Sequence, residues 1–228
     1  TAAVGLGRTR SPGAVEPLLS ALEHFHPKVK SATARSLGQI GDTRATNPLS
    51  VMLADPIHRT PVRLAVVEAL GLLGDTVAVP MLLLTLGDGE DKVRLETIRS
   101  LGRIKAPRAI PALSLLLREP KLAFSVARAL MTMGHSEAQP ALIRAIRTPE
   151  LGREAIEASF TALGSIGSKS TVSALTPYLS GDDLEVARWA ASALGRIAHR
   201  SAAEPLLDAM RREDPALRDM SAWALQQI

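Results

Sequence analysis

The chain has 228 residues, of which 46% are hydrophobic and 22% are charged, and its formal net charge of +4 is modest; this composition argues against intrinsic disorder. Aromatic residues make up only 3%, which is typical of closely packed helices rather than of sheets rich in aromatic and β-branched residues. The absence of cysteine excludes disulfides and cysteine nucleophiles and fits a reducing compartment, so we expect a cytoplasmic protein.

A leucine recurs along the sequence at intervals of 29 to 33 residues. The positions that share this spacing are Leu6, Leu37, Leu70, Leu101, Leu130, Leu163, Leu194 and Leu225. A period of about thirty residues is typical of a solenoid built from repeated pairs of elements. Because one such pair cannot bury its apolar side alone, the repeats must stack on their neighbours.

The segments around these leucines predict two helices and a turn in each repeat. Residues 62–71, VRLAVVEALG, place apolar side chains at offsets 0, 4, 7 and 8 from the valine, which is the buried stripe of a helix. A second apolar helix is predicted within 74–86. The pattern of the first helix returns at 93–102 and at 186–195, and residues 200–210 again predict a second helix.

Glycine and proline mark the helix ends. We expect glycines to end the first helix of a repeat in the left-handed conformation, at Gly41, Gly74, Gly134 and Gly167. Prolines recur where the first turn of the second helix is expected, and a proline costs little there because those amides have no helical partner: Pro17, Pro48, Pro80, Pro111, Pro140 and Pro205.

Residues 60–86 and 91–117, TPVRLAVVEALGLLGDTVAVPMLLLTL and DKVRLETIRSLGRIKAPRAIPALSLLL, resemble HEAT repeats of the short class first described in phycobilisome lyases. The resemblance implies an α-solenoid with the Val-Arg helix on the concave surface and the proline-bearing helix outside. It also implies an ion pair between Asp88 and Arg94, six positions later, whereas Asp55 and Arg63 fit that spacing less well.

We therefore predict an all-α protein, a right-handed α-solenoid of about seven stacked helix pairs, forming a single domain over residues 1–228. The sequence starts and stops inside repeats, at Thr1 and Ile228, without the polar caps of terminal repeats. We expect it to be a segment of a longer repeat protein.

The sequence favours no catalytic residue, cofactor or metal. All five histidines fall in predicted turns or at helix boundaries, and His24 and His26 would supply only two ligands for a metal. No apolar run is long enough to cross a membrane. We expect a non-catalytic scaffold that binds a protein partner, with a bilin lyase or chaperone-type subunit that binds a tetrapyrrole, or a nucleic-acid-binding module, as alternatives.

Offsets 2, 6 and 10 of the Val-Arg helices lie away from the buried stripe and should form the concave groove. They hold six arginines, no lysine and three acids. The residues at these offsets are Ser31, Arg35, Gln39, Leu64, Glu68, Leu72, Leu95, Arg99, Arg103, Phe124, Arg128, Thr132, Glu157, Thr161, Ser165, Arg188, Ser192, Arg196, Asp219, Trp223 and Gln227. Arginine binds carboxylates through two parallel hydrogen bonds, so we expect an acidic partner segment. Pairing of these arginines with neighbours such as Glu68 and Glu96 is the competing interpretation.

The partner-binding residues predicted in this groove are Arg35, Arg99, Arg103, Phe124, Arg128, Arg188, Trp189, Arg196 and Trp223. Trp189 and Trp223 occupy adjacent repeats near Arg188 and Arg196, and tryptophan and arginine dominate the energetics of protein interfaces. We expect these four residues to form an anchor site. Filling of space between helices is the alternative role for Trp189.

Overall fold

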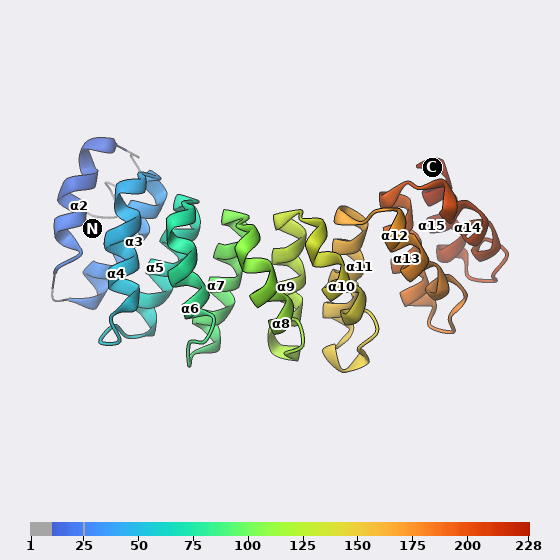
Figure 1. The fold of residues 1–228 in the computed structure, drawn as a ribbon, viewed down its shortest axis with the longest axis horizontal. Coiled ribbons are helices and arrows are strands. Elements are labelled where there is room, and N and C mark those ends of the chain that lie inside the picture. The colour runs from blue at the N-terminus through green and yellow to red at the C-terminus, as the bar shows by residue number, and fades with distance from the viewer. Residues whose placement is uncertain (1–10, 25) are drawn as a thin grey trace. The chain divides into compact units, whose positions relative to one another are not determined.

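The structure, a computed structural model, describes residues 11–24 and 26–228. Within these residues every regular element is a helix and no strand occurs, which confirms the predicted all-α class (Figure 1). The chain divides into two compact units, one ending at Ala109 and the other beginning at Ile110. Thr1 and Leu6 lie outside the described residues.

Long and short helices alternate in both units. The helices of the first unit are α2 (Val15–Ala21), α3 (Pro27–Ile40), α4 (Thr46–Ala54), α5 (Thr60–Leu73), α6 (Val79–Thr85) and α7 (Asp91–Ile104). Those of the second unit are α8 (Ile110–Leu116), α9 (Pro120–Met133), α10 (Gln139–Ala145), α11 (Arg153–Ile166), α12 (Lys169–Leu175), α13 (Leu184–Ile197), α14 (Ala203–Ala209) and α15 (Pro215–Gln226). This alternation is the α-solenoid that the leucine period predicts.

The long helices are α3, α5, α7, α9, α11, α13 and α15, of which α5 and α7 hold the Val-Arg pair itself. The six predicted prolines lie in the short helices α2, α4, α6, α8, α10 and α14, whereas α12 has none. Each proline lies at the second or third residue of its short helix, for example Pro80 in α6 and Pro205 in α14, as predicted. Most short helices follow a 3-10 turn, such as Thr76–Ala78 before α6. The first turn therefore tolerates proline because its amides need no helical acceptor.

The glycine ends are confirmed in three of four places. Gly41, Gly74 and Gly134 have φ of 82°, 69° and 75° and end their long helices in the left-handed region. Gly167 was expected to do the same, but this prediction is wrong, because its φ is −68° and its backbone is extended. There the chain passes directly into the capping box of α12, formed by Ser168 and Thr171, which supplies the first amides of α12 with acceptors.

The recurring leucines form the core of each unit. Leu37, Leu70 and Leu101 are fully buried in the first unit. In the second unit Leu130, Leu163 and Leu194 are fully buried, whereas Leu225 on α15 is partly exposed. Burial of a leucine side chain contributes about 1.5 to 3 kcal/mol relative to exposure, so these positions supply much of the packing energy.

Adjacent long helices approach closely at the glycine that follows the leucine. An added Cβ at Gly38 would come within 2.7 Å of the Ala69 backbone, and one at Gly71 would come within 2.7 Å of Ser100 Cβ. The second unit repeats the arrangement, with Gly195 facing Ala224 at 2.8 Å. The Leu-Gly pair of the template therefore supplies both a buried side chain and a close helix contact.

Ion pairs connect neighbouring repeats at the start of the long helices. Asp88 accepts a hydrogen bond of 2.6 Å from Arg63, one repeat earlier. Arg94 donates to the Leu86 carbonyl at 2.9 Å and forms an ion pair with Asp91 at 3.6 Å. Asp88 thus joins α5 to the loop that precedes α7, and it does not form the ion pair with Arg94 that the resemblance implies, because Arg63 of the preceding repeat takes its carboxylate.

Candidate functional site

The predicted groove residues lie on the long helices, on the side that faces away from the buried leucines. We call the set on α3, α5 and α7 the unit 1 face (Arg35, Gln39, Leu64, Glu68, Leu72, Leu95, Arg99 and Arg103) and the set on α9 to α15 the unit 2 face (Phe124, Arg128, Thr132, Glu157, Thr161, Ser165, Arg188, Ser192, Arg196, Asp219, Trp223 and Gln227). None of these residues is buried. Ser31 was expected among them, but it is buried, because its hydroxyl turns toward α5 and donates to the Pro61 carbonyl at 3.2 Å.

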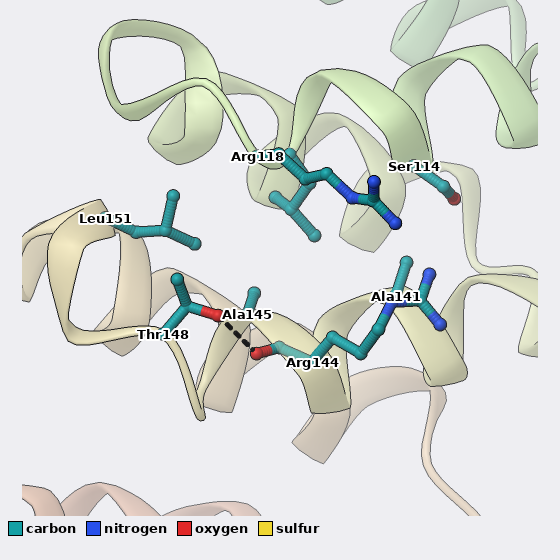
Figure 2. A pocket seen from close by; sticks show the side chains of 8 residues that line it. Ser114, Arg118, Ala141, Arg144, Ala145, Thr148 and Leu151 are labelled. Atoms are coloured by element: carbon teal, nitrogen blue, oxygen red, sulfur yellow. Dashed lines mark hydrogen bonds between the residues drawn. The ribbon is translucent and has the colours of Figure 1, made fainter.

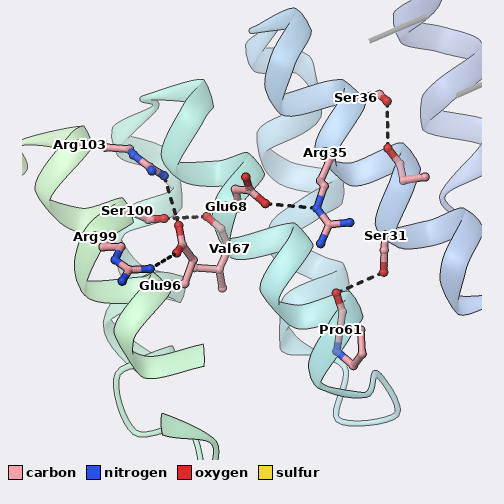
Figure 3. A network of polar contacts seen from close by, with 11 residues as sticks. Ser31, Arg35, Ser36, Pro61, Val67, Glu68, Glu96, Arg99, Ser100 and Arg103 are labelled. Carbon is pink, nitrogen blue, oxygen red and sulfur yellow. Dashed lines mark hydrogen bonds and ion pairs between the residues drawn. The ribbon is translucent and has the colours of Figure 1, made fainter. Parts of the chain in front are cut away.

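The arginines of the unit 1 face have carboxylate partners inside the unit (Figure 3). Arg35 on α3 donates to Glu68 on α5 at 3.3 Å. Glu96 on α7 accepts from both Arg99 at 3.1 Å and Arg103 at 3.2 Å. The pairing that competes with partner binding is therefore present here, and Glu96 lowers the net charge of this face although it lies outside the predicted offsets.

On the unit 2 face, Phe124 and Arg128 form one wall of a pocket. The guanidinium carbon of Arg128 lies 5.7 Å from the centroid of the Phe124 ring, within the range of a cation–π contact. The pocket has a volume of about 230 Å³ and is lined by Phe124, Arg128, Met131, Glu154, Glu157, Ala158 and Thr161. Phe124 is 39% exposed, so part of its side chain is accessible to a partner.

Arg188 is engaged within the chain. It donates two hydrogen bonds to Asp214, at 3.0 and 2.6 Å, and Asp214 also accepts the Leu217 amide and so caps α15. The hydrogen bond from Arg188, together with that from the Leu217 amide, lowers the pKa of Asp214. The guanidinium of Arg188 therefore holds two repeats together.

The two tryptophans lie in different surroundings. Trp189 is half-buried, with its ring centroid 6.3 Å from that of Phe160, and Arg153 lies over its ring at 5.8 Å. Trp223 is 38% exposed and lies against Gly195, where an added Cβ would approach the indole at 2.5 Å. No contact between the two indoles occurs among the described residues. Trp189 thus packs partly against Phe160 and Arg153, and the anchor role predicted for it stays a prediction.

Arg196 lies on the same helix as Trp189 but differs from Arg188 in its bonding. In the part of the chain that the structure describes, Arg196 makes no hydrogen bond or ion pair, and it is exposed. Arg128 has likewise no carboxylate partner there. These two guanidinium groups carry positive charge that the described residues do not neutralise.

Sequence reasoning missed a second group of cavities, which lie between the short helices. One of them is lined by Arg118 and Arg144 (Figure 2). These arginines follow no repeating pattern, since the equivalent positions in other repeats hold residues such as Leu84 and Asp208. Only the structure brings them to one cavity.

Metal ligation finds no support in the residues 11–24 and 26–228. No group of three or more histidine, cysteine, aspartate or glutamate side chains there could hold an ion. His24 Nδ1 accepts the His26 amide, and His26 Nδ1 accepts the Lys28 amide at the start of α3. Nor is any helix in this part of the chain long and apolar enough to cross a bilayer.

Comparison with known families agrees with the repeat architecture. A family model for HEAT repeats matches residues 1–60, 59–123 and 174–228, which together exceed half of the chain. The chain belongs to the HEAT repeat family. A model for the PBS lyase HEAT-like repeat also matches residues 122–148, so the resemblance to this short class is confirmed.

A named relative shares sequence with this chain. It is phycocyanobilin lyase subunit alpha of Picosynechococcus sp. (strain ATCC 27264 / PCC 7002 / PR-6), which is 30% identical over 186 residues. The match covers 79% of this chain and 62% of the relative, so the chain spans less than two thirds of the length of that subunit.

Two solved structures share the fold of this HEAT chain. A chain in the complex of CpcE and CpcF of phycocyanin lyase from Nostoc sp. PCC7120 has a TM-score of 0.58 at 24% identity, covering 93% of this chain and 86% of that one. YibA of Escherichia coli has a TM-score of 0.63 at 17% identity, covering 96% and 83%. At these identities both structures establish the fold alone.

Proposed function

We propose that this HEAT chain is a non-catalytic scaffold that binds a protein partner on its long-helix faces, with the unit 2 face as the main contact. The observation that carries the proposal is the exposure of Phe124 and Trp223, at 39% and 38%, on that face. The chain has only six aromatic residues among 228, three Phe, two Trp and one Tyr, so two exposed rings on one face are a large share.

Exposed aromatic rings beside arginines are the usual anchors of a protein interface. Covering such a ring contributes about 25 cal/mol for each Å² of apolar surface removed from water. Phe124 has Arg128 over its ring, and both line the same pocket. Trp223 lies on Gly195, whereas the side chain of Arg196 runs toward α11, where an added Cβ at Gly164 would lie 3.1 Å from Arg196 Cδ. Phe124 thus has a cation beside it, and Trp223 supplies a second exposed ring of a residue type in which hot spots are enriched.

The charge of this face supports a partner segment that carries carboxylates. Arg128 and Arg196 have no carboxylate partner among the described residues, whereas Arg35, Arg99, Arg103 and Arg188 already have one. A guanidinium without an internal partner gains more from an incoming carboxylate than one that must first give up an ion pair. We therefore assign acidic recognition to Arg128 and Arg196 and place the other four arginines in the framework.

The proposal predicts loss of partner binding in Phe124→Ala, Trp223→Ala and Arg196→Ala. Each change should weaken binding by more than about 1 kcal/mol, because each removes a central interface group. The measurement is quantitative affinity capture with mass spectrometry, followed by titration of the captured protein against each variant. Leu207→Ala is the matched control, since Leu207 is an apolar side chain 51% exposed on the short helix α14.

Retention of the partner by all three variants would place the working surface elsewhere. A random DNA duplex, tested at two salt concentrations, separates the nucleic-acid alternative. Tight binding that falls steeply with salt, lost evenly across Arg35, Arg99, Arg103, Arg128 and Arg196, would favour nucleic acid, because counterion release is spread over all phosphate contacts.

A second candidate function is that of a subunit of a bilin lyase, favoured by the relative named phycocyanobilin lyase subunit alpha. The test is incubation of the protein with phycocyanobilin and apo-phycocyanin, alone and with a candidate partner subunit, and detection of covalently attached bilin by fluorescence of the denatured acceptor. Under the scaffold proposal we expect no transfer above the rate without enzyme. Faster transfer that requires this chain would replace the scaffold proposal by the lyase function.

A further inference from the structure

Three cavities lie at equivalent places between consecutive short helices. In the first unit a cavity of about 320 Å³ separates α4 from α6. In the second unit one of about 310 Å³ separates α8 from α10, and another of about 430 Å³ lies between α12 with its following 3-10 turn and α14. The repeat itself therefore makes these cavities, and the side chains at a few positions give each one its chemistry.

Alignment of the repeats shows this equivalence residue by residue. Leu53, Leu117 and Leu179 occupy one wall of the three cavities, and all three are buried. Thr85, Ala145 and Ala209 occupy the opposite wall. Apolar walls are thus a constant property of the cavity, whereas two positions at its opening vary.

The two variable positions differ in charge among the three cavities. The position after the wall leucine is Ala54, Arg118 or Ser180, in that order. The facing position on the next short helix is Leu84, Arg144 or Asp208. Of these three cavities, the one between α8 and α10 alone has an arginine on both sides, so its charge does not follow from the fold.

Charged residues at the other two cavities have partners inside the chain. Asp88 accepts from Arg63 at 2.6 Å, Asp208 accepts from Arg211 at 3.0 Å, and Arg212 donates to the Leu179 carbonyl at 2.7 Å. Neither Arg118 nor Arg144 makes a side-chain hydrogen bond or ion pair within residues 11–24 and 26–228. Figure 2 shows the two side chains extending from opposite walls, with both guanidinium groups at the same end of the cavity.

Two like charges held at one opening repel each other, and an anion between them removes that repulsion. The remaining lining is Ser114, Leu117, Ala141, Ala145, Thr148 and Leu151, which is mostly apolar. The Thr148 hydroxyl donates its proton to the Arg144 carbonyl at 2.9 Å, so this proton does not bond to a ligand. The volume lies at the lower end of the range for small-ligand sites, which is about 300 to 1,000 Å³.

We propose that the cavity between α8 and α10 binds a carboxylate joined to a short apolar group, with Arg118 and Arg144 holding the carboxylate and Leu117 and Leu151 contacting the apolar part. Guanidinium groups match the planar geometry of a carboxylate. The apolar walls disfavour a fully hydrated anion. This site is separate from the long-helix faces and does not depend on the function proposed for them.

The probe is hexanoate, titrated into the protein while amide shifts are followed by NMR. We expect saturable binding at one site, with shifts centred on α8 and α10. Hexanol and inorganic phosphate should bind at least about tenfold more weakly, because the first lacks the charge-assisted hydrogen bonds and the second lacks the apolar group. A tripeptide, acetyl-Ala-Ala-Leu with a free carboxyl end, and its amidated form distinguish a protein terminus from a free acid as the source of the carboxylate.

Variants test the roles of the two arginines. Arg118→Gln and Arg144→Gln should each weaken hexanoate binding by about tenfold. Arg147→Gln is the matched control and should leave the affinity unchanged, since Arg147 is exposed on the same turn but does not line the cavity. Circular dichroism of each variant checks that it is folded.

Binding of either the free-acid peptide or hexanoate, lost in both cavity variants, supports the proposal and identifies the source. Equal binding of hexanol or of phosphate would overturn it, as would equal affinities of Arg118→Gln, Arg144→Gln and Arg147→Gln. Absence of saturable binding by both acids would also overturn it.

Discussion

Leu101→Ala should lower the free energy of unfolding by about 2 to 5 kcal/mol, whereas Arg99→Ala should lower it by less than about 1 kcal/mol. Leu101 is fully buried in α7, so its truncation removes apolar contacts and leaves a cavity that the close-packed helices cannot fill. The Arg99 side chain is 58% exposed, and its ion pair with Glu96 is a surface pair. Urea denaturation of both variants and of the unchanged chain measures the difference.

The comparison also tests the position of every residue on the long helices. Leu101 and Arg99 lie two residues apart in α7, so their side chains point to different sides of the same helix. Both changes introduce alanine within that helix, so the difference between them reports burial. If both variants lost the same stability, α7 would be rotated about its axis relative to the structure, and the assignment of the unit 1 face would fail with it.

Gly71→Ala should cost about 3 kcal/mol, although alanine favours helices over glycine by about 1 kcal/mol. The new Cβ would come within 2.7 Å of Ser100 Cβ, nearer than the two helices allow. The Ser100 hydroxyl donates to the Val67 carbonyl across this contact at 2.9 Å, and separation of the helices would also break that buried hydrogen bond. Thermal and urea unfolding give the magnitude.

Two further variants separate crowding from a general effect of replacing glycine. Gly89→Ala should be close to neutral, because a Cβ at Gly89 meets no atom within 4 Å. Gly71→Ala combined with Ser100→Gly should recover part of the loss, because the small residue then lies on the partner helix. A stable Gly71→Ala variant would show that α5 and α7 separate at little cost.

The helices could be predicted because their signals are local and repeat. The leucine period located the core, and the prolines located the short helices, since both depend on one helix and its first turn. Gly167 and Ser31 went wrong for a shared reason: a contact made with another segment decides the outcome. At the end of α11, next to Gly167, the Gln139 side chain of α10 donates to the Ile166 carbonyl at 2.6 Å. The hydroxyl of Ser31 donates to the Pro61 carbonyl on the next long helix.

The candidate site was harder to predict, because charge on a surface depends on which side chains meet. Offsets placed six arginines on the long-helix faces, but pairing with Glu96 and with Asp214 connects residues outside those offsets. Arg118 and Arg144 were missed because no periodic rule relates them. They come close because α8 stacks next to α10. The sequence of either helix alone does not show this contact.

The glycine contacts between long helices set how each unit responds to force. Where Gly71 meets Ser100, or Gly195 meets Ala224, the two helices leave no room even for an added Cβ, so they cannot move closer together. The short helices have open cavities between them. When a unit bends, the short helices therefore change their separation while the long helices stay in contact at the glycines. In the first unit, a load on the long-helix face would therefore change the width of the cavity between α4 and α6 more than the separation of α3 and α5, which meet at Gly38 and Ala69.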